Sequence, residues 1–325
     1  MAATAIHGNA AAAISTSGAA RFGSPGGDLP RHLNFKGSSS FSSLVFRADF
    51  MASTLRGGNR LEVVRAVTTA AAAAPAIDPT LQDSLKRAVA KRAVELVKPG
   101  MIVGLGTGST SSMAIQELGK LVSQGKLKDV VGVASSYQSR ILARQYGVKT
   151  VDLNDVNVID FAFDGADEVD ASMNLIKGGG AAHTMEKVVD AMAKQCIILV
   201  DQSKVVSKLG LTFPVPVEVL PFAISPVLRA LVGLGGVPEI RNALRKDGPV
   251  ITDLGNMVVD VRFPDGVKNP AEMERSINMI PGVVESGLFV GIANTVLVAT
   301  RDGDEITIVE LADFVRSLKE ATASG

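Results

Sequence analysis

The chain has 325 residues, 46% of them hydrophobic and 20% charged, which is enough for one large or two modest globular domains. Basic and acidic residues balance at 33 each, but the chain after residue 70 has 26 basic and 30 acidic residues, which argues against a nucleic-acid-binding body. No apolar run approaches the length of a membrane-spanning helix, and the single cysteine, Cys196, excludes an intramolecular disulfide and a Cys-rich zinc site.

Residues 1–75 have the composition of a targeting leader. They are rich in Ala, Ser, Gly and Arg and poor in acids. No apolar stretch follows a basic start, as a secretory signal requires, whereas an acid-poor segment with Ser and Arg is typical of plastid and mitochondrial transit peptides. We expect removal of this leader between Arg60 and Pro75. The alternative is a disordered tail without targeting meaning, because its polar stretches have too little apolar surface to fold.

The first motif of chemical interest lies between a strand and a helix. Residues 81–97 have helical apolar spacing, and residues 101–103 read as a short buried strand. The strand runs into the glycine-rich segment Gly104–Thr110, and residues 112–122 continue as a helix. Strand, glycine loop and helix in this order present backbone N–H groups and a helix N-terminus to an anion.

The glycine spacing argues against two nucleotide-binding motifs. A dinucleotide fingerprint needs a third glycine where this chain has Ser109 or Ser111, and a P-loop needs a Gly-Lys-Ser/Thr that does not follow. The hydroxyl groups of Thr107, Ser109 and Thr110 suit a sugar phosphate instead. A structural turn that binds no ligand is the alternative.

Strands and helices then alternate up to about residue 200. Strands are expected at 129–134, 149–153, 158–163 and 195–200, and helices at 137–146 and 185–194. This alternation predicts an α/β fold with a mostly parallel, Rossmann-like sheet and helices on both faces.

A second, smaller domain is predicted within this fold. Residues 212–286 read as strand, helix, strand, strand, helix, strand, which is the order of an α+β domain of split-βαβ, ferredoxin-like type; one long strand is expected at 250–263. The strands at 294–300 and 305–310 are expected to rejoin the first sheet. The predicted domains are a leader at 1–75, a catalytic α/β domain formed by 76–211 and 287–325, and an inserted domain at 212–286.

The densest group of chemical side chains follows the predicted strand 158–163. It consists of two carboxylates, a lysine, three glycines and a glutamate: Asp164, Asp167, Lys177, Gly178, Gly179, Gly180 and Glu186. Catalytic groups of α/β enzymes usually lie in loops at strand ends. Asp164 and Asp167 flank a tight turn, so both are expected to face one small molecule. Lys177 is a candidate for stabilising a phosphate or an oxyanion, and Glu186 for a proton-transferring base.

Each of these residues also has a structural interpretation. Asp-Gly is a common turn dipeptide, and a glycine run is often a flexible loop. Thr184 is expected to cap a helix, which would place Glu186 in its first turn, where the helix dipole favours an ionised carboxylate. An acid there is also ordinary helix chemistry. Lys204, just after the strand 195–200, is either a phosphate-binding or a solvated lysine.

Five motifs stand in a characteristic order: GLGTGST (Gly104–Thr110), DGADEVD (Asp164–Asp170), IKGGGAA (Ile176–Ala182), the pair Glu186-Lys187, and DQSKVV (Asp201–Val206). Together they resemble the motifs of the A-type ribose-5-phosphate isomerases. The similarity extends from Leu81 to Leu311, and the leader resembles the plastid form found in plants. One departure is Met185, where the family commonly has Arg or a similar residue before the glutamate.

The resemblance implies reversible conversion of D-ribose 5-phosphate into D-ribulose 5-phosphate without a metal or an organic cofactor. It implies that Glu186 is the general base, moving a proton between C2 and C1 through a cis-enediol(ate), and that Asp164, Asp167 and Lys177 assist ring opening and handle the sugar oxygens. The implied substrate-binding positions are Thr107, Gly108, Ser109, Thr110, Gly165, Ala166, Gly178, Gly179, Gly180 and Lys204.

The resemblance also bears on partners and place. It implies a homodimer or homotetramer that binds a sugar phosphate, while the charge balance and the lack of a long apolar run argue against nucleic acid and membrane as partners. It favours the chloroplast stroma as the location, and the pentose phosphate pathway and Calvin cycle as the metabolic context.

Three alternatives remain open. An amino-sugar-phosphate deaminase or a CoA transferase on a similar fold would differ in the spacing between Lys177 and Glu186. A sugar-phosphate-sensing regulator would need a DNA-binding segment, but the N-terminal region has no helix-turn-helix pattern. A catalytically weakened relative is suggested by Met185. His183 is the one histidine after the leader, so histidine-based chemistry and a His–carboxylate metal site have little support.

Overall fold

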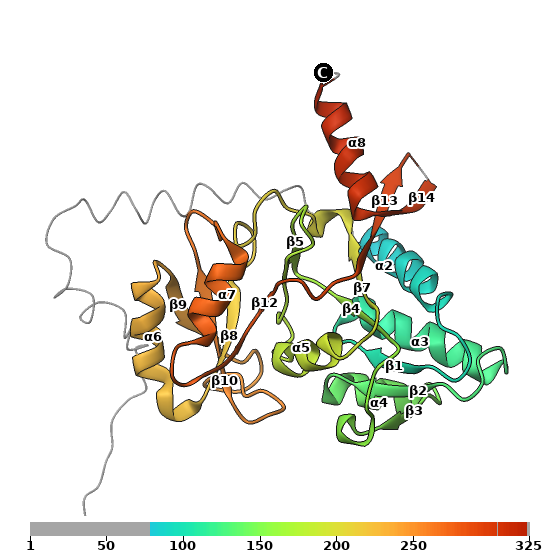
Figure 1. The fold of residues 1–325 in the computed structure, drawn as a ribbon, viewed down its shortest axis with the longest axis horizontal. Coiled ribbons are helices and arrows are strands. Elements are labelled where there is room, and N and C mark those ends of the chain that lie inside the picture. Colours follow the sequence, from blue (N-terminus) through green and yellow to red (C-terminus); the bar gives the residue numbers. More distant parts are fainter. Residues whose placement is uncertain (1–78, 304, 324–325) are drawn as a thin grey trace, which may run out of the picture. The chain divides into compact units, whose positions relative to one another are not determined.

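The computed structural model describes residues 79–303 and 305–323 (Figure 1). The predicted leader at 1–75 lies outside these residues. No helix in the described ranges is long and apolar enough to cross a membrane. The described strands form one large sheet, one four-stranded sheet and one very small sheet.

The large sheet has seven strands in the order β14-β13-β7-β4-β1-β2-β3. All neighbouring pairs are parallel except β13 and β14. The strands are β1 (Ile102–Leu105), β2 (Val131–Ala134), β3 (Lys149–Val151), β4 (Phe161–Gly165), β7 (Cys196–Asp201), β13 (Thr295–Asp302) and β14 (Glu305–Glu310). All six residues of β7 are buried, as expected for a central strand covered on both faces. The prediction of a mostly parallel sheet is confirmed.

Helices cover both faces of this sheet. Successive side chains of a strand point to opposite faces, so neighbouring residues of one strand belong to different cores. Phe161 and Phe163 pack in one core with residues of α2, α3 and α4, whereas Ala162 packs with Val189 of α5 in another. On the side of Ala162, Ile198 of β7 shares a core with residues of α8. The helices are α2 (Pro79–Val94), α3 (Ser109–Ser123), α4 (Tyr137–Gln145), α5 (His183–Ala191) and α8 (Leu311–Ala323).

The four-stranded sheet belongs to a small domain with its own core (Figure 1). Its strands are antiparallel and lie in the order β11-β8-β10-β9. The elements in chain order are β8 (Val215–Val219), α6 (Ile224–Gly233), β9 (Val237–Ile240), β10 (Met257–Arg262), α7 (Pro270–Asn278) and β11 (Val283–Ser286). Val217 and Val259 of the sheet pack with Val227 of α6 and Ile277 of α7. This is the split-βαβ arrangement, so the predicted fold class is confirmed.

The strand expected at 250–263 is shorter than predicted. β10 begins at Met257, because a turn precedes it in which the Thr252 N–H donates to the Asn256 carbonyl (2.8 Å) and Gly255 has a φ of 84°. Apolar residues on both sides of the turn made the segment read as one strand.

The third sheet was not predicted. Its strands, β5 (Glu168–Val169), β6 (Leu175–Ile176) and β12 (Leu288–Phe289), have two residues each, which is too short to show a periodic pattern. The sheet positions Lys177, which follows β6 directly: the Lys177 N–H donates to the carbonyl of Gly287 (2.9 Å). Three 3₁₀ helices complete the described elements: η1 (Leu153–Asp155), η2 (Gln202–Lys204) and η3 (Pro221–Ala223).

Candidate active site

A hollow of about 130 Å³ lies where three neighbouring strands of the large sheet end. The glycine loop follows β1, the segment from Gly165 follows β4, and Lys204 follows β7. Parallel strands direct their carboxyl ends to the same edge of a sheet, so these segments converge there. The lining residues are Lys86, Thr107, Gly108, Ser109, Thr110, Gly165, Ala166, Asp167, Lys177, Gly178, Gly179, Gly180, Glu186 and Lys204. All ten predicted substrate-binding positions are among them.

Asp164 has a different place from the one predicted. Its side chain is fully buried and does not line the hollow, so the prediction that both aspartates face one small molecule is wrong for Asp164. Its Oδ1 accepts hydrogen bonds from the Thr107 N–H (3.0 Å), the Ser111 hydroxyl (3.0 Å) and the Gly165 N–H (2.7 Å). Its Oδ2 lies 2.8 Å from Lys177 Nζ. Asp164 therefore ties the glycine loop to β4 and holds the lysine.

The close approach of the glycine loop to Asp164 explains one of its glycines. A Cβ atom at Gly106 would lie 2.2 Å from Asp164 Oδ1, which is far inside contact distance. The Gly106 N–H also donates to the Phe163 carbonyl (3.0 Å). Any side chain at position 106 would push the loop away from β4 and disrupt both contacts.

Lys177 is buried between two carboxylates. Its Nζ lies 2.8 Å from Asp164 Oδ2 and 3.3 Å from Glu186 Oε2, and it donates to the Gly165 carbonyl (2.6 Å). Burial alone would lower the pKa of Lys177, but the charges of Asp164 and Glu186 outweigh it and raise that pKa above its ordinary value. The ammonium group is therefore charged throughout the physiological range.

Glu186 lies in the first turn of α5 and is 4% exposed. Burial raises its pKa to about 8; the charge of Lys177 opposes this, and the carboxylate of Asp164 adds to it. The helix dipole favours the ionised form, but its effect is ordinarily about 0.3–1 kcal/mol, and the loss of hydration outweighs it here. A carboxyl group with such a pKa can both accept and return a proton near neutral pH.

The start of α5 also differs from the prediction. The helix begins at His183 with Ala182 as its N-cap, so Thr184 does not cap it. The Thr184 hydroxyl instead donates to the carboxylate of Glu218 on β8. This hydrogen bond joins α5 to the small domain.

One turn after Glu186, the carboxyl group of Asp190 is buried, and no hydrogen bond reaches either of its oxygens from the described residues. Burial, then the nearby charge of Asp164, raises its pKa well above the ordinary value. A single lysine cannot neutralise three carboxylates in a dehydrated site. The raised pKa favours the uncharged form of Asp190, and the Lys177 ammonium contacts the carboxyl groups of Asp164 and Glu186.

Asp167 is the carboxylate that does line the hollow. Its Oδ2 accepts a hydrogen bond from the Gly179 N–H (2.8 Å). A Cβ atom at Gly179 would lie 2.8 Å from Asp167 Oδ1, so a side chain at position 179 would displace the carboxylate. The glycine run is thus a fixed part of the site, and Asp167 is a partly buried acceptor in its lining.

The lining of the hollow also includes positively charged groups. Lys204 lies in η2, Lys86 comes from α2, and Ser109 and Thr110 begin α3, a helix of 15 residues. Lys86 was not predicted, because a lysine within an amphipathic helix pattern has no sequence signal that separates it from a solvated one. The Thr107 hydroxyl bonds to Ser135 and Ser136 (2.9 and 2.8 Å), so it serves to hold the loop. Two lysines and a helix N-terminus suit a phosphate group.

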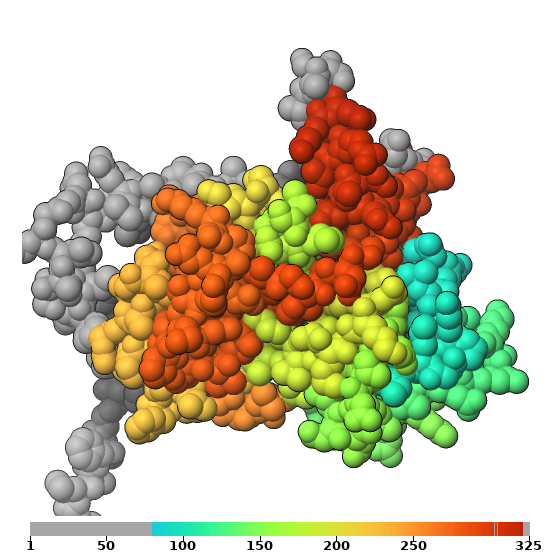
Figure 2. Space-filling view, in the orientation of Figure 1, coloured from blue at the N-terminus to red at the C-terminus, as the bar shows by residue number. Residues whose placement is uncertain are grey.

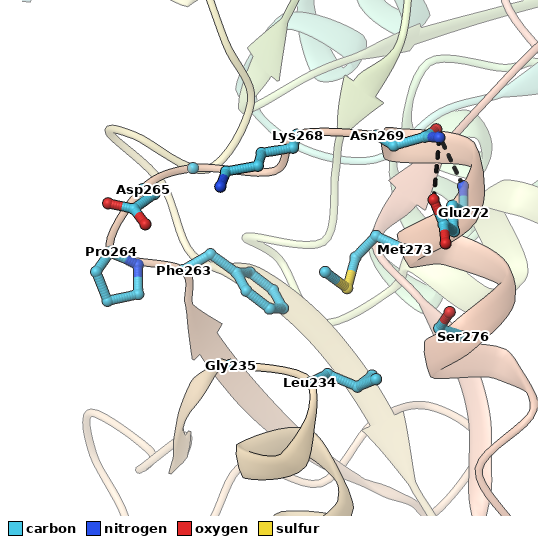
Figure 3. Close-up of a pocket in the computed structure, with 11 residues that line it drawn as sticks. Leu234, Gly235, Phe263, Pro264, Asp265, Lys268, Asn269, Glu272, Met273 and Ser276 are labelled. Atoms are coloured by element: carbon cyan, nitrogen blue, oxygen red, sulfur yellow. Dashed lines mark hydrogen bonds between the residues drawn. The ribbon is translucent and has the colours of Figure 1, made fainter.

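A larger cavity of about 380 Å³ lies in the small domain and contains none of the predicted site residues (Figure 3). Phe263 and Met273 extend toward one another across it, and Asn269 caps α7 through the Glu272 N–H. No group of three or more His, Cys, Asp or Glu side chains in the described ranges is placed to hold a metal ion. The concentration of perturbed ionisable groups favours the smaller hollow as the functional site.

The fold and the site together are those of an α/β enzyme with a buried carboxyl group beside a buried ammonium group. Comparison with known proteins gives the family. The family model of ribose 5-phosphate isomerase A (phosphoriboisomerase A) matches residues 131–303, and the chain belongs to this family. The ribose-5-phosphate isomerase A of Thermosynechococcus vestitus is 59% identical over 214 residues, which are 66% of this chain and 90% of that protein.

Two solved structures are similar over most of the described chain. Ribose 5-phosphate isomerase A from Methanocaldococcus jannaschii is 47% identical with a TM-score of 0.66, over 70% of this chain and 99% of that chain. A D-ribose-5-phosphate isomerase in complex with phospho-erythronic acid is 43% identical with a TM-score of 0.68, over 70% of this chain and 98% of that chain. Met185, the departure from the family pattern, does not line the hollow.

Proposed function

We propose that this chain interconverts D-ribose 5-phosphate and D-ribulose 5-phosphate through a cis-enediol(ate), with Glu186 as the base. The observation that carries the proposal is the 3.3 Å contact between the Glu186 carboxyl and the Lys177 ammonium, in a hollow that Lys86 and Lys204 also line. An aldose–ketose isomerase needs one base that reaches two adjacent carbons and a charge that stabilises the enediolate. The proposal assigns these two roles to the Glu186 carboxyl and the Lys177 ammonium, which lie together in the site.

The proton transfers follow from this geometry. Glu186 takes the proton from C2 of the open-chain aldose, and the electron pair moves to the C1 carbonyl, whose oxygen becomes an enediolate oxygen. Negative charge thus moves from Glu186 to the substrate while Lys177 stays charged beside both, so the site does not have to reorganise. The proton then returns to C1, and the hydroxyl proton on O2 passes to O1. We assign this hydroxyl transfer and ring opening to Asp167, which lines the hollow.

Lys204 is expected to act on binding more than on turnover. A phosphate anchor far from the reacting carbons binds the ground state and the transition state equally, so Lys204→Ala should raise KM and leave kcat nearly unchanged. Steady-state kinetics with ribose 5-phosphate measures both constants. Lys194→Ala is the matched control, since Lys194 is exposed and does not line the hollow. A loss of kcat with unchanged KM would refute the anchor role.

The pH dependence has a definite sign. The base must be ionised to accept a proton, and the pKa of Glu186 is about 8, so kcat/KM should rise from pH 7 to pH 8 and level off above it. The substrate phosphate, with a second pKa of about 6, is already doubly ionised over this range. Initial rates in buffers of equal ionic strength measure the profile. A rate that is flat or falls between pH 7 and pH 8 contradicts the raised pKa.

The function itself is tested with the protein from about residue 70 onward and ribose 5-phosphate in the presence of EDTA. Formation of ribulose 5-phosphate that persists with the chelator is the expected result. A folded protein without this conversion would contradict the proposal and would favour a catalytically weakened relative or a ligand-binding role. Met185→Arg would then be the first variant to test.

We also propose a chloroplast location, with roles in the Calvin cycle and the pentose phosphate pathway, and a homodimer or homotetramer. The acid-poor composition of residues 1–75 and the identity with the Thermosynechococcus enzyme support the location. A fluorescent protein fused to residues 1–75 should enter chloroplasts, and its exclusion would reject the leader interpretation. Light scattering of the purified protein gives the mass, and a monomer would reject the oligomer.

A further inference from the structure

An arginine of the small domain reaches the glycine run of the active site. Arg241 follows β9 directly, and its Nη1 donates to the carbonyl oxygens of Gly178 (2.8 Å) and Gly179 (3.1 Å). Asp260 on β10 holds the other side of the guanidinium, accepting from Nε at 2.9 Å and from Nη2 at 2.5 Å. Figures 1 and 2 show the small domain beside the segment that contains α5.

One peptide group links Arg241 to the active-site carboxylate. The peptide between Gly178 and Gly179 accepts from Arg241 through its carbonyl, and donates through its N–H to Asp167 Oδ2 (2.8 Å). The positive charge on one side and the carboxylate on the other polarise this peptide in the same direction, which strengthens both hydrogen bonds. If the peptide turned over, its carbonyl oxygen would face Asp167 and repel it.

The glycine run has no side chains of its own with which to fix this orientation. Gly178 has a φ of 106°, and a Cβ atom there would lie 2.7 Å from His183 Nδ1. A Cβ atom at Gly179 would approach Asp167 equally closely. Glycine at both positions allows the close approach, but glycine backbone is also the most free to rotate. The contacts from Arg241 restrict this freedom from outside the loop.

We propose that Arg241 is a positioning residue for the isomerase reaction, which fixes the peptide between Gly178 and Gly179 so that its N–H holds the Asp167 carboxylate in place. Asp260 orients the guanidinium. The small domain thereby contributes to a site whose lining comes from the large domain. This inference rests on the proposed function, because it assigns Arg241 a role through Asp167.

The test is a double-mutant cycle between Arg241 and Asp167. Arg241→Gln should lower kcat for ribose 5-phosphate by about 10- to 100-fold, which is the range expected for misplacing a catalytic group by about 1 Å. Combined with Asp167→Asn, the same change should lower kcat less than about twofold further, because the residue it acts through is already disabled. Equal effects in both backgrounds, or an unchanged kcat in Arg241→Gln, would overturn the proposal.

Hydrogen exchange gives a readout that does not depend on activity. Mass spectrometry of a peptide containing Gly178–Gly180 should show faster amide exchange in Arg241→Gln than in the wild-type protein. Arg262→Ala, at an exposed position at the end of β10, is the matched control and should leave the exchange unchanged. Unchanged exchange in Arg241→Gln would reject the proposed role of Arg241. If the wild-type protein had no isomerase activity but the predicted exchange pattern was observed, only the proposed function would be rejected.

Two milder variants test the proposal in case Arg241→Gln does not fold. Asp260→Asn keeps the guanidinium and removes its ionic partner, so it should give smaller changes of kcat and exchange in the same direction. Arg241→Lys should recover part of the activity lost in Arg241→Gln, because it restores the charge but not the fork that contacts two carbonyls and a carboxylate. Full activity in Arg241→Gln and Asp260→Asn would contradict the proposal.

Discussion

Glu186→Gln is expected to lower kcat for ribose 5-phosphate by about 100-fold or more, because removal of a general base typically costs about 10²–10⁴-fold. Glutamine has the shape of glutamate but cannot accept the C2 proton. The fold should be retained, since the neighbouring Lys177 still has Asp164 at 2.8 Å. Steady-state kinetics and circular dichroism of the same preparation measure both outcomes.

The same variant makes a second, opposite prediction for stability. Because burial raises the pKa of Glu186 to about 8, the folded state binds this proton more tightly than the unfolded chain does. The contribution of Glu186 to the free energy of unfolding is complete below the pKa that Glu186 has in the unfolded chain, and it is lost as the pH rises toward 8. Glutamine does not titrate, so Tm of Glu186→Gln relative to the wild type should increase between pH 5 and pH 9.

Glu95→Gln is the matched control, because the side chain of Glu95 is half exposed on the surface. It should change neither kcat nor the pH dependence of Tm. Near-normal turnover in Glu186→Gln would refute the assignment of the base. A Tm difference that does not change with pH would show that Glu186 is ionised at neutral pH in the folded protein.

Lys177→Met is expected to impair both turnover and folding. Loss of a charge that stabilises the enediolate typically costs about 10²–10³ in kcat. The free energy of unfolding should also fall by about 3–5 kcal/mol, because the change leaves the buried Asp164 carboxylate without its cation. Initial rates and urea unfolding at pH 8 measure the two effects.

A double variant separates the two roles of this lysine. Lys177→Met combined with Asp164→Asn removes the buried unpaired charge and should recover much of the stability, but none of the activity. Lys194→Met, at an exposed lysine outside the hollow, is the control for loss of a positive charge. If the double variant recovered turnover, Lys177 would be a structural residue and the enediolate would be stabilised by another group.

The predictable parts of the fold are those that depend on neighbours along the chain. Alternating strands and helices indicated the parallel sheet and the inserted split-βαβ domain, since β4 and β7 are buried on both faces and read as apolar runs. The two-residue strands β5, β6 and β12 left no pattern, because they are formed by contacts between distant segments. The turn before β10 was hidden for a related reason: the residues on both sides of it are apolar.

The sequence by itself determined which residues are the candidates, because Asp167, Lys177, the glycines and Glu186 lie within one short segment and resemble the motifs of a known family. Only the tertiary structure decided how these groups share their charges. Dehydration in the folded core raises the pKa of Glu186. The same packing buries Asp164 completely and places Lys177 beside it as its ion-pair partner.

The remaining residues could not be predicted because they lie far from the other site residues along the chain. Lys86 lies about a hundred residues before Glu186, and Arg241 lies in another domain, 63 residues after Gly178. Neither has a local pattern that separates it from a solvated surface residue. Side chains from separate elements meet only when the sheets pack, and the interaction energy of a charge depends on the distances and the dielectric environment that this packing creates.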